Sequence, residues 1–124
     1  MDTVSIRYIV TDVDAALAFY VEKLGFQVDQ RPAPGFANLS RGNLRLLLNQ
    51  PGAGGAGQPM PDGQIPSPGG WNRMQIVVED IAAVARALQQ AGCRFRNEIV
   101  TGQGGKQVLV EDPSGNPVEL FEPA

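Results

Sequence analysis

The chain has 124 residues, 43% of them apolar and 19% charged, and its thirteen acidic and ten basic side chains give a net charge of −3. This length and composition predict a single folded domain over 1–124 and exclude a disordered chain. The basic residues form no run, so we expect no nucleic-acid partner. The sequence contains no histidine, which is the commonest metal ligand and the commonest general base.

The one cysteine, Cys93, rules out an internal disulfide and a cysteine cluster for zinc or iron–sulfur. A lone thiol is typical of a reducing compartment. The N-terminus lacks the positively charged region of a signal peptide, and no apolar run approaches the ~18 residues of a membrane-spanning helix. We therefore expect a cytoplasmic location and no membrane partner.

The first half, about 1–49, predicts one strand, one helix and three further strands. An apolar run is followed by Asp12, which is the expected N-cap of the helix. The helix carries an apolar stripe and ends at Gly25, because glycine accepts the left-handed conformation found after helix ends. Strand-like runs follow at 26–29, 36–40 and 44–48.

The middle segment, about 50–70, is rich in glycine and proline and shows no hydrophobic period, which predicts a loop. Long loops in small domains often cover binding sites. The sequence leaves two interpretations open, an inert connector and a flap over a ligand cleft.

The second half, about 71–124, repeats the pattern of the first. An apolar run leads to Asp80 as the expected N-cap, and the helix ends at Gly92. The sequence of 112–116 is a strong turn signal. Each half therefore predicts a βαβββ unit, and the two tandem units predict an α+β fold with a concave mixed sheet and the helices on its outer face. The three strand-like runs after the helix are 94–100, 107–111 and 118–121.

These motifs resemble the vicinal oxygen chelate superfamily, which includes glyoxalase I, bleomycin-resistance proteins and extradiol dioxygenases. The resemblance covers nearly the whole chain outside the loop, and its motifs are specific for fold but weak for reaction. It implies a homodimer, because proteins of the bleomycin-resistance branch pair with their grooves at or near the interface. The motifs that carry it are Val10-Thr11-Asp12, Ala16, Phe19-Tyr20, Leu24-Gly25-Phe26, Val78-Glu79-Asp80 and 111–120.

Enzymes of this superfamily hold a divalent metal with four residues, usually His, Gln or Glu. The resemblance implies that these positions fall here at Ser5, near Arg45, at Arg73 and at Glu119. Only Glu119 agrees with the family's pattern, since a guanidinium stays protonated and repels a dication. We therefore expect no metal and no other cofactor.

Strand alternation predicts the side chains that face the cleft, because residues two apart lie on the same face. Trp71 begins the second half, where it either packs at a hinge or stacks on a planar ligand. Arg94 and Arg96 are expected on a solvated or dimer-rim face. The predicted ligand-binding set is Ser5, Arg7, Arg45, Trp71, Arg73, Gln75, Glu119 and Phe121.

The preferred function is metal-free binding of an anionic or planar small molecule, such as an antibiotic or a metabolite. Arg45 or Arg73, paired with Glu119, would grip its anionic group. The alternative within the family is a metal-dependent lyase, isomerase or dioxygenase. A metal-free enzyme with Glu119 as base ranks lower, because an adjacent arginine stabilises the charged carboxylate. An interaction module, or a merely solvated sheet face, also remains open.

Overall fold

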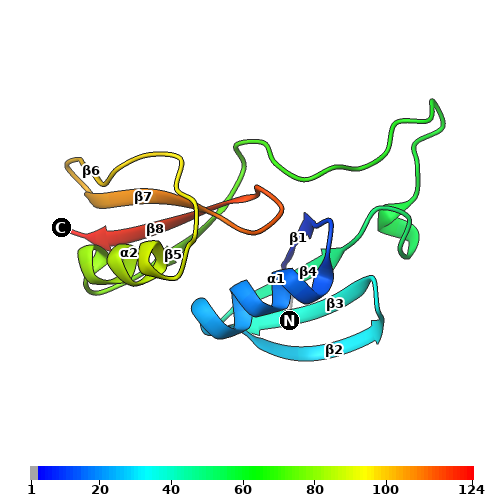
Figure 1. The fold of residues 1–124 in the computed structure, drawn as a ribbon, viewed down its shortest axis with the longest axis horizontal. Helices are drawn as coiled ribbons and strands as arrows, with labels where there is room; N and C mark the ends of the chain where they lie inside the picture. Colours follow the sequence, from blue (N-terminus) through cyan, green and yellow to red (C-terminus); the bar gives the residue numbers. More distant parts are fainter. Residues whose placement is uncertain (1–2) are drawn as a thin grey trace. The chain divides into compact units, whose positions relative to one another are not determined.

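Both halves of the chain start with a strand and a capped helix and continue with strands, as the computed structural model shows for residues 3–124 (Figure 1). The described residues divide into unit 1, which ends at Pro68, and unit 2, which spans Gly69–Ala124. Each unit contains one four-stranded sheet. The predicted α+β class with two tandem βαβββ units is confirmed.

The elements of unit 1 are β1 (Ser5–Ile9), α1 (Val13–Leu17), a π-helical segment (Ala18–Lys23), β2 (Gln27–Ala33), β3 (Phe36–Arg41), β4 (Leu44–Asn49) and a 3-10 helix (Gly55–Gly57). The strand order in its sheet is β1-β4-β3-β2. Strand β1 is parallel to β4, whereas β3 is antiparallel to both of its neighbours.

The elements of unit 2 are β5 (Met74–Val77), α2 (Ile81–Gln90), β6 (Val100–Thr101), β7 (Gly105–Glu111) and β8 (Pro117–Pro123). The strand order is β5-β8-β7-β6, with β5 parallel to β8 and the other pairs antiparallel. The two sheets therefore share one topology, in which the first strand lies at an edge beside the last.

The predicted strand over 94–100 is wrong for most of its length. Only Val100 and Thr101 pair as β6, and Phe95 makes one isolated bridge to β7. The side chain of Asn97 explains the interruption, because its Oδ1 accepts the backbone N–H of Leu109 at 2.9 Å. This side chain replaces the backbone carbonyl that a continuous ladder would need.

The predicted N-caps of both helices are confirmed. Asp12 Oδ1 accepts the N–H of Ala15 at 3.3 Å, and Asp80 Oδ1 accepts the N–H of Ala83 at 3.1 Å. Each carboxylate thereby satisfies one of the backbone donors that a helix leaves free at its start.

A second side chain at each helix start comes from the end of the sheet. Gln50, directly after β4, accepts the N–H of Val13 through Oε1 at 2.9 Å. Glu122 of β8 accepts the N–H of Ile81 through Oε1 at 3.0 Å. These bonds fasten each helix to the last strand of its own unit, across 37 and 41 residues of chain.

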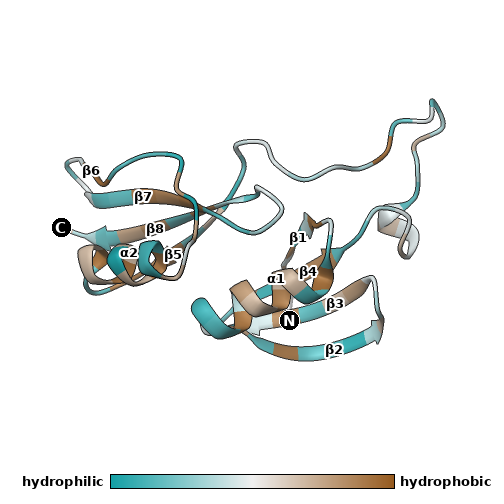
Figure 2. Cartoon of the chain, in the orientation of Figure 1, coloured by the Kyte–Doolittle hydropathy of each residue, from teal (hydrophilic) through white to brown (hydrophobic). Residues whose placement is uncertain are grey.

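The predicted alternation of buried and exposed residues is confirmed in β4 and β5, whereas all of β2 is exposed and Pro117, Val118, Glu119 and Leu120 of β8 are all buried. In β4, Leu46 and Leu48 are fully buried, and in β5, Met74 and Ile76 are buried while Gln75 between them is exposed. Figure 2 shows apolar residues in both helices and in β4, β7 and β8. In unit 1, the ring of Tyr20 is the centre of edge-to-face contacts with Tyr8, Phe19 and Phe26.

A glycine with positive φ follows the π-helical segment that continues α1, and another follows α2, as predicted: 76° at Gly25 and 86° at Gly92. A Cβ added at Gly92 would meet nothing within 4 Å, so the cost of a side chain there comes from the backbone alone. We expect Gly92→Ala to lower the free energy of unfolding by about 1 kcal/mol, measured by urea denaturation. The control is Gly55→Ala, which also has open space but no positive φ, and which should be neutral or slightly stabilising. Equal effects at the two sites would contradict this explanation.

The glycine- and proline-rich segment is not uniform. Its beginning folds onto unit 1, where the N–H of Gln50 donates to the carbonyl of Gly35 at 2.9 Å and Asn49 Nδ2 donates to the carbonyl of Ala53 at 3.2 Å. Its end belongs to unit 2, where the N–H of Gly69 donates to Asn116 Oδ1 at 2.7 Å. Over residues 3–124, no helix is long and apolar enough to cross a membrane.

Candidate functional site

The central polar cluster of unit 2 joins β5 to β8. Arg73 donates to Glu119 Oε1 from Nε at 3.1 Å and from Nη2 at 2.9 Å. Gln75 Nε2 donates to Glu119 Oε2 at 2.7 Å, and Gln75 lies directly beside Glu119 in the strand register. The structure thus brings together three of the predicted site residues on the sheet face opposite α2. Arg73, one of the two arginines considered as partners of this carboxylate, pairs with it within unit 2.

The carboxylate of Glu119 is largely withdrawn from solvent. Its side chain is 10% exposed, and that of Arg73 is 30% exposed. Both carboxylate oxygens carry hydrogen bonds from neighbouring side chains, and the opposite charges cancel within the cluster. A bound molecule therefore meets no net charge from this pair.

The cluster does not fit a divalent metal. Glu119 is the one family ligand position with a suitable side chain, and its two oxygens already accept from Arg73 and Gln75. Across the part of the chain that the structure describes, no three or more His, Cys, Asp or Glu side chains gather in a way that could hold an ion. The corresponding positions in unit 1, Ser5 and Arg45, offer a neutral hydroxyl and a cation.

The other predicted residues of unit 2 surround this cluster. Phe121 lies two residues along β8 from Glu119, on the same face, and pairs in register with the exposed Val77. Trp71 precedes β5 and is 69% exposed. Arg73 Nη1 donates to the carbonyl of Trp71 at 3.3 Å, which links the tryptophan to the cluster.

Arg96 is a functional candidate that the sequence interpretation misplaced. It does not lie on a solvated rim: its side chain is 16% exposed and each of its three nitrogens is bonded. Nε donates to Glu111 Oε2 at 2.9 Å, Nη1 to the carbonyl of Gly70 at 2.6 Å, and Nη2 to the carbonyl of Gly115 at 2.9 Å. Its Cζ also lies 4.7 Å from the centroid of the Trp71 ring. The alternation of side chains around Arg96 in the sequence could not predict these contacts, because the hydrogen-bond partners of Arg96 lie 15 to 26 residues away along the chain.

The predicted turn at 112–116 is confirmed, and its two polar ends, Asp112 and Asn116, are buried. Asp112 Oδ1 accepts the N–H groups of Ser114 and Asn116, both at 2.9 Å, and Oδ2 accepts Asn116 Nδ2 at 3.0 Å. Asn116 in turn holds the start of unit 2 through Gly69, so the turn fixes the backbone just before Trp71.

In unit 1, the predicted residues lie on the sheet face opposite α1. Ser5 of β1 is directly beside Arg45 of β4, and Arg7 is two residues further along β1. All three are exposed. Neither Arg7 nor Arg45 forms an ion pair with an acidic side chain among residues 3–68 of unit 1. Two uncompensated guanidiniums on one face distinguish this sheet from that of unit 2.

Two asparagines on the same face of unit 1 were missed by the sequence interpretation. Asn49 is 2% exposed, and its Oδ1 has no hydrogen-bond donor among the described residues; the same holds for the buried Oδ1 of Asn38. Asn38 pairs in register with Leu47, two residues before Asn49 on β4. No motif in the sequence marks these positions, because their environment depends on strand pairing and on the segment that follows β4.

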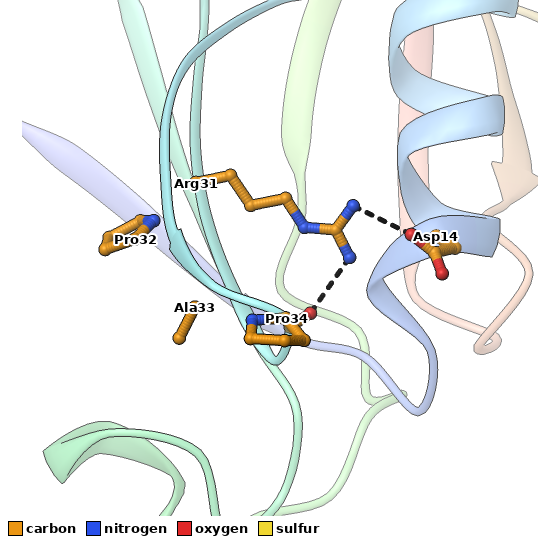
Figure 3. A pocket seen from close by; sticks show the side chains of 5 residues that line it. All are labelled: Asp14, Arg31, Pro32, Ala33 and Pro34. Carbon is orange, nitrogen blue, oxygen red and sulfur yellow. Dashed lines mark hydrogen bonds and ion pairs between the residues drawn. The ribbon is translucent and has the colours of Figure 1, made fainter.

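A shallow hollow of about 430 Å³ borders α1 and the end of β2, outside the predicted site (Figure 3). Arg31, whose guanidinium lines the hollow, forms an ion pair with Asp14 at 2.8 Å and donates a hydrogen bond to the carbonyl of Pro34 at 3.0 Å. None of the predicted site residues lines this hollow. The residues that line it are Asp14, Arg31, Pro32, Ala33 and Pro34.

Comparison with known proteins places this architecture in a family. The family model of the Glyoxalase/Bleomycin resistance protein/Dioxygenase superfamily matches residues 3–120. The chain belongs to this superfamily, so the resemblance found in the sequence motifs is confirmed. No curated protein matches the chain.

Several solved structures share the fold. A member of the glyoxalase/bleomycin resistance protein/dioxygenase superfamily from Sphaerobacter thermophilus DSM 20745 is 26% identical, with a TM-score of 0.77 over 98% of this chain and 97% of the other. TnmS3, an antibiotic binding protein from Streptomyces sp. CB03234, is 22% identical, with a TM-score of 0.75 over 100% and 97% of the two chains. Lactoylglutathione lyase from Agrobacterium tumefaciens is 21% identical, with a TM-score of 0.73 over 98% and 92%. Because one neighbour is a binding protein and another a lyase, the fold leaves the function open.

Proposed function

We propose that this chain is a metal-free small-molecule-binding protein of the glyoxalase/bleomycin-resistance type. The observation that supports this most directly is the state of Glu119, whose two oxygens accept hydrogen bonds from Arg73 and Gln75. A cation that took this carboxylate would have to break those bonds and tolerate a guanidinium about 3 Å from the same oxygen.

The chemistry of the ligand follows from the arginines of unit 1. Arg7 and Arg45 carry charge with no acidic partner among the described residues of unit 1, and they share one sheet face. Guanidiniums bind carboxylates and similar anions through paired N–H groups. We therefore propose that these two residues, with Ser5 beside them, receive an anionic group of the ligand.

An antibiotic or a metabolite is the ligand class that we propose. TnmS3, which shares the fold, is described as an antibiotic binding protein. The alternative function is a metal-dependent lyase, isomerase or dioxygenase, and the lactoylglutathione lyase with the same fold is its precedent. The binding function is favoured because the residues at the family's metal positions are poor metal ligands.

The metal content of the purified protein tests the choice between these functions. We expect less than about 0.1 divalent ions per chain when the protein is prepared without chelator and measured by elemental analysis. We also expect no change in melting temperature on adding Zn²⁺, Mn²⁺ or Ni²⁺, since an ion that binds the folded state stabilises it. A stoichiometric ion, or clear stabilisation by one of these metals, would refute the metal-free proposal.

We further propose that the protein is a homodimer in a reducing, cytoplasmic compartment. Strands β1 and β5 each lie at the edge of a four-stranded sheet, and such edges carry backbone groups that can pair with another strand. We expect light scattering to give a mass of about twice the 13.2 kDa of one chain. A monomer at micromolar concentration would contradict the dimer.

A further inference from the structure

Trp71 is fixed in position although it is largely exposed. One face of its indole ring lies against the guanidinium of Arg96, 4.7 Å from the ring centroid. The backbone before it is held twice, because Arg96 Nη1 donates to the carbonyl of Gly70 and the N–H of Gly69 donates to Asn116 Oδ1. Both the ring and the chain leading to it are therefore held by unit 2 itself.

Arg96 loses its mobility through its other partners. Glu111 binds Nε and the carbonyl of Gly115 binds Nη2, each at 2.9 Å. A guanidinium that is bonded at every nitrogen is held in one orientation, and the indole ring in contact with it is thereby supported on one face. The structure thus orders a large aromatic surface that remains 69% exposed to solvent.

Hydrogen-bond donors lie next to this aromatic surface. Arg73 binds the carbonyl of Trp71 through Nη1, and three of its five N–H groups are used by Trp71 and Glu119. The other two have no partner among the described residues. Since Glu119 cancels the charge of Arg73, these donors suit a neutral acceptor such as a carbonyl or an amide oxygen, in contrast to the unpaired arginines of unit 1.

We propose that Trp71 and Arg73 form a subsite for a planar aromatic part of the ligand that carries a carbonyl or amide oxygen at its edge, with Arg96 as the positioning residue for Trp71. The inference rests on the proposed ligand-binding function and adds the chemical class of the ligand. The outer face of the indole stacks on the aromatic ring, and the free N–H groups of Arg73 donate to the oxygen.

The test compares two neutral amides with the same carbon skeleton, naphthalene-2-carboxamide and trans-decahydronaphthalene-2-carboxamide. The first is planar and aromatic, whereas the second is saturated and more hydrophobic. We expect the aromatic amide to bind roughly tenfold more tightly in calorimetry, because stacking adds to the burial of apolar area. It should also shift the indole N–H resonance, which reports Trp71 alone since the chain has one tryptophan.

Three variants assign the roles. Trp71→Leu should bring the ratio of the two dissociation constants close to one. Arg96→Met should reduce the ratio several-fold and make the Trp71 fluorescence easier to quench with acrylamide, while Arg96→Lys, which keeps the cation, should restore part of both. Arg94→Met removes an exposed cation two residues away and should change neither. If Arg96→Met does not fold, Glu111→Gln weakens the support of Arg96 and should give the same changes at smaller size.

The outcomes separate this proposal from the proposed function. Equal affinity for the two amides, no binding of the aromatic amide, or an unchanged ratio in Trp71→Leu overturns the subsite. An unchanged ratio and unchanged quenching in Arg96→Met overturns the positioning role of Arg96. The anion-binding function is measured independently with an anionic probe and the Arg7 and Arg45 variants, so it can fail or hold regardless of these results.

Discussion

Arg73→Met is expected to lower the free energy of unfolding by about 2 kcal/mol in urea denaturation. The variant keeps most of the side-chain volume but leaves the carboxylate of Glu119 with Gln75 as its remaining side-chain partner. Breaking a buried ion pair costs about 3–5 kcal/mol, and the partial exposure of Arg73 reduces that figure.

The double variant Arg73→Met/Glu119→Leu is the control for this prediction. Removing both charges leaves no buried ion without its partner, so most of the lost stability should return. A cost below about 0.5 kcal/mol for Arg73→Met would place the pair among ordinary surface ion pairs. Glu119 would then be easier to recruit for a cation, and the metal-free proposal would lose its main support.

The second large effect is expected on ligand binding in unit 1. The double variant Arg7→Met/Arg45→Met should bind cyclohexane-1,3-dicarboxylate at least tenfold more weakly than the wild type in calorimetry. Each charge-assisted hydrogen bond contributes about 1.5–3 kcal/mol where it forms. The affinity of the wild type should fall as salt is raised, because both guanidiniums are exposed.

Arg31→Met is the matched control for this effect. Arg31 is also a cation of unit 1, but its guanidinium is already engaged by Asp14 and by the carbonyl of Pro34. Its removal should leave the affinity for the dicarboxylate within about twofold of the wild type. An equal loss in Arg31→Met, or no loss in the double variant, would show that overall charge rather than this face governs the interaction.

The local features of the fold were predictable from the sequence. Asp12 and Asp80 cap the helices, and Gly25 and Gly92 follow their ends with positive φ. These features are set within one turn of chain, where the residue type decides the backbone conformation. The sheet face on which each strand residue lies was also predictable, because successive side chains of a strand point to opposite faces of the sheet.

Features that depend on distant partners were not predictable. The bonds from Gln50 and Glu122 to the helix starts, and the network around Arg96, join residues between 15 and 41 positions apart. The strand expected over 94–100 failed for the same reason, since the side chain of Asn97 takes the donor that the strand would have used.

The sequence by itself determined the repeat, the strand faces and the residue types at the family's metal positions, because all three are read from spacing and chemistry along the chain. Tertiary structure decided how the arginines differ. Within unit 2, Arg73 pairs with Glu119 and its charge is neutralised, and Arg96 supports Trp71. Within unit 1, Arg7 and Arg45 have no acidic partner among the described residues. The physical reason is that the charge presented to a ligand depends on which side chains the strand register brings within hydrogen-bond distance.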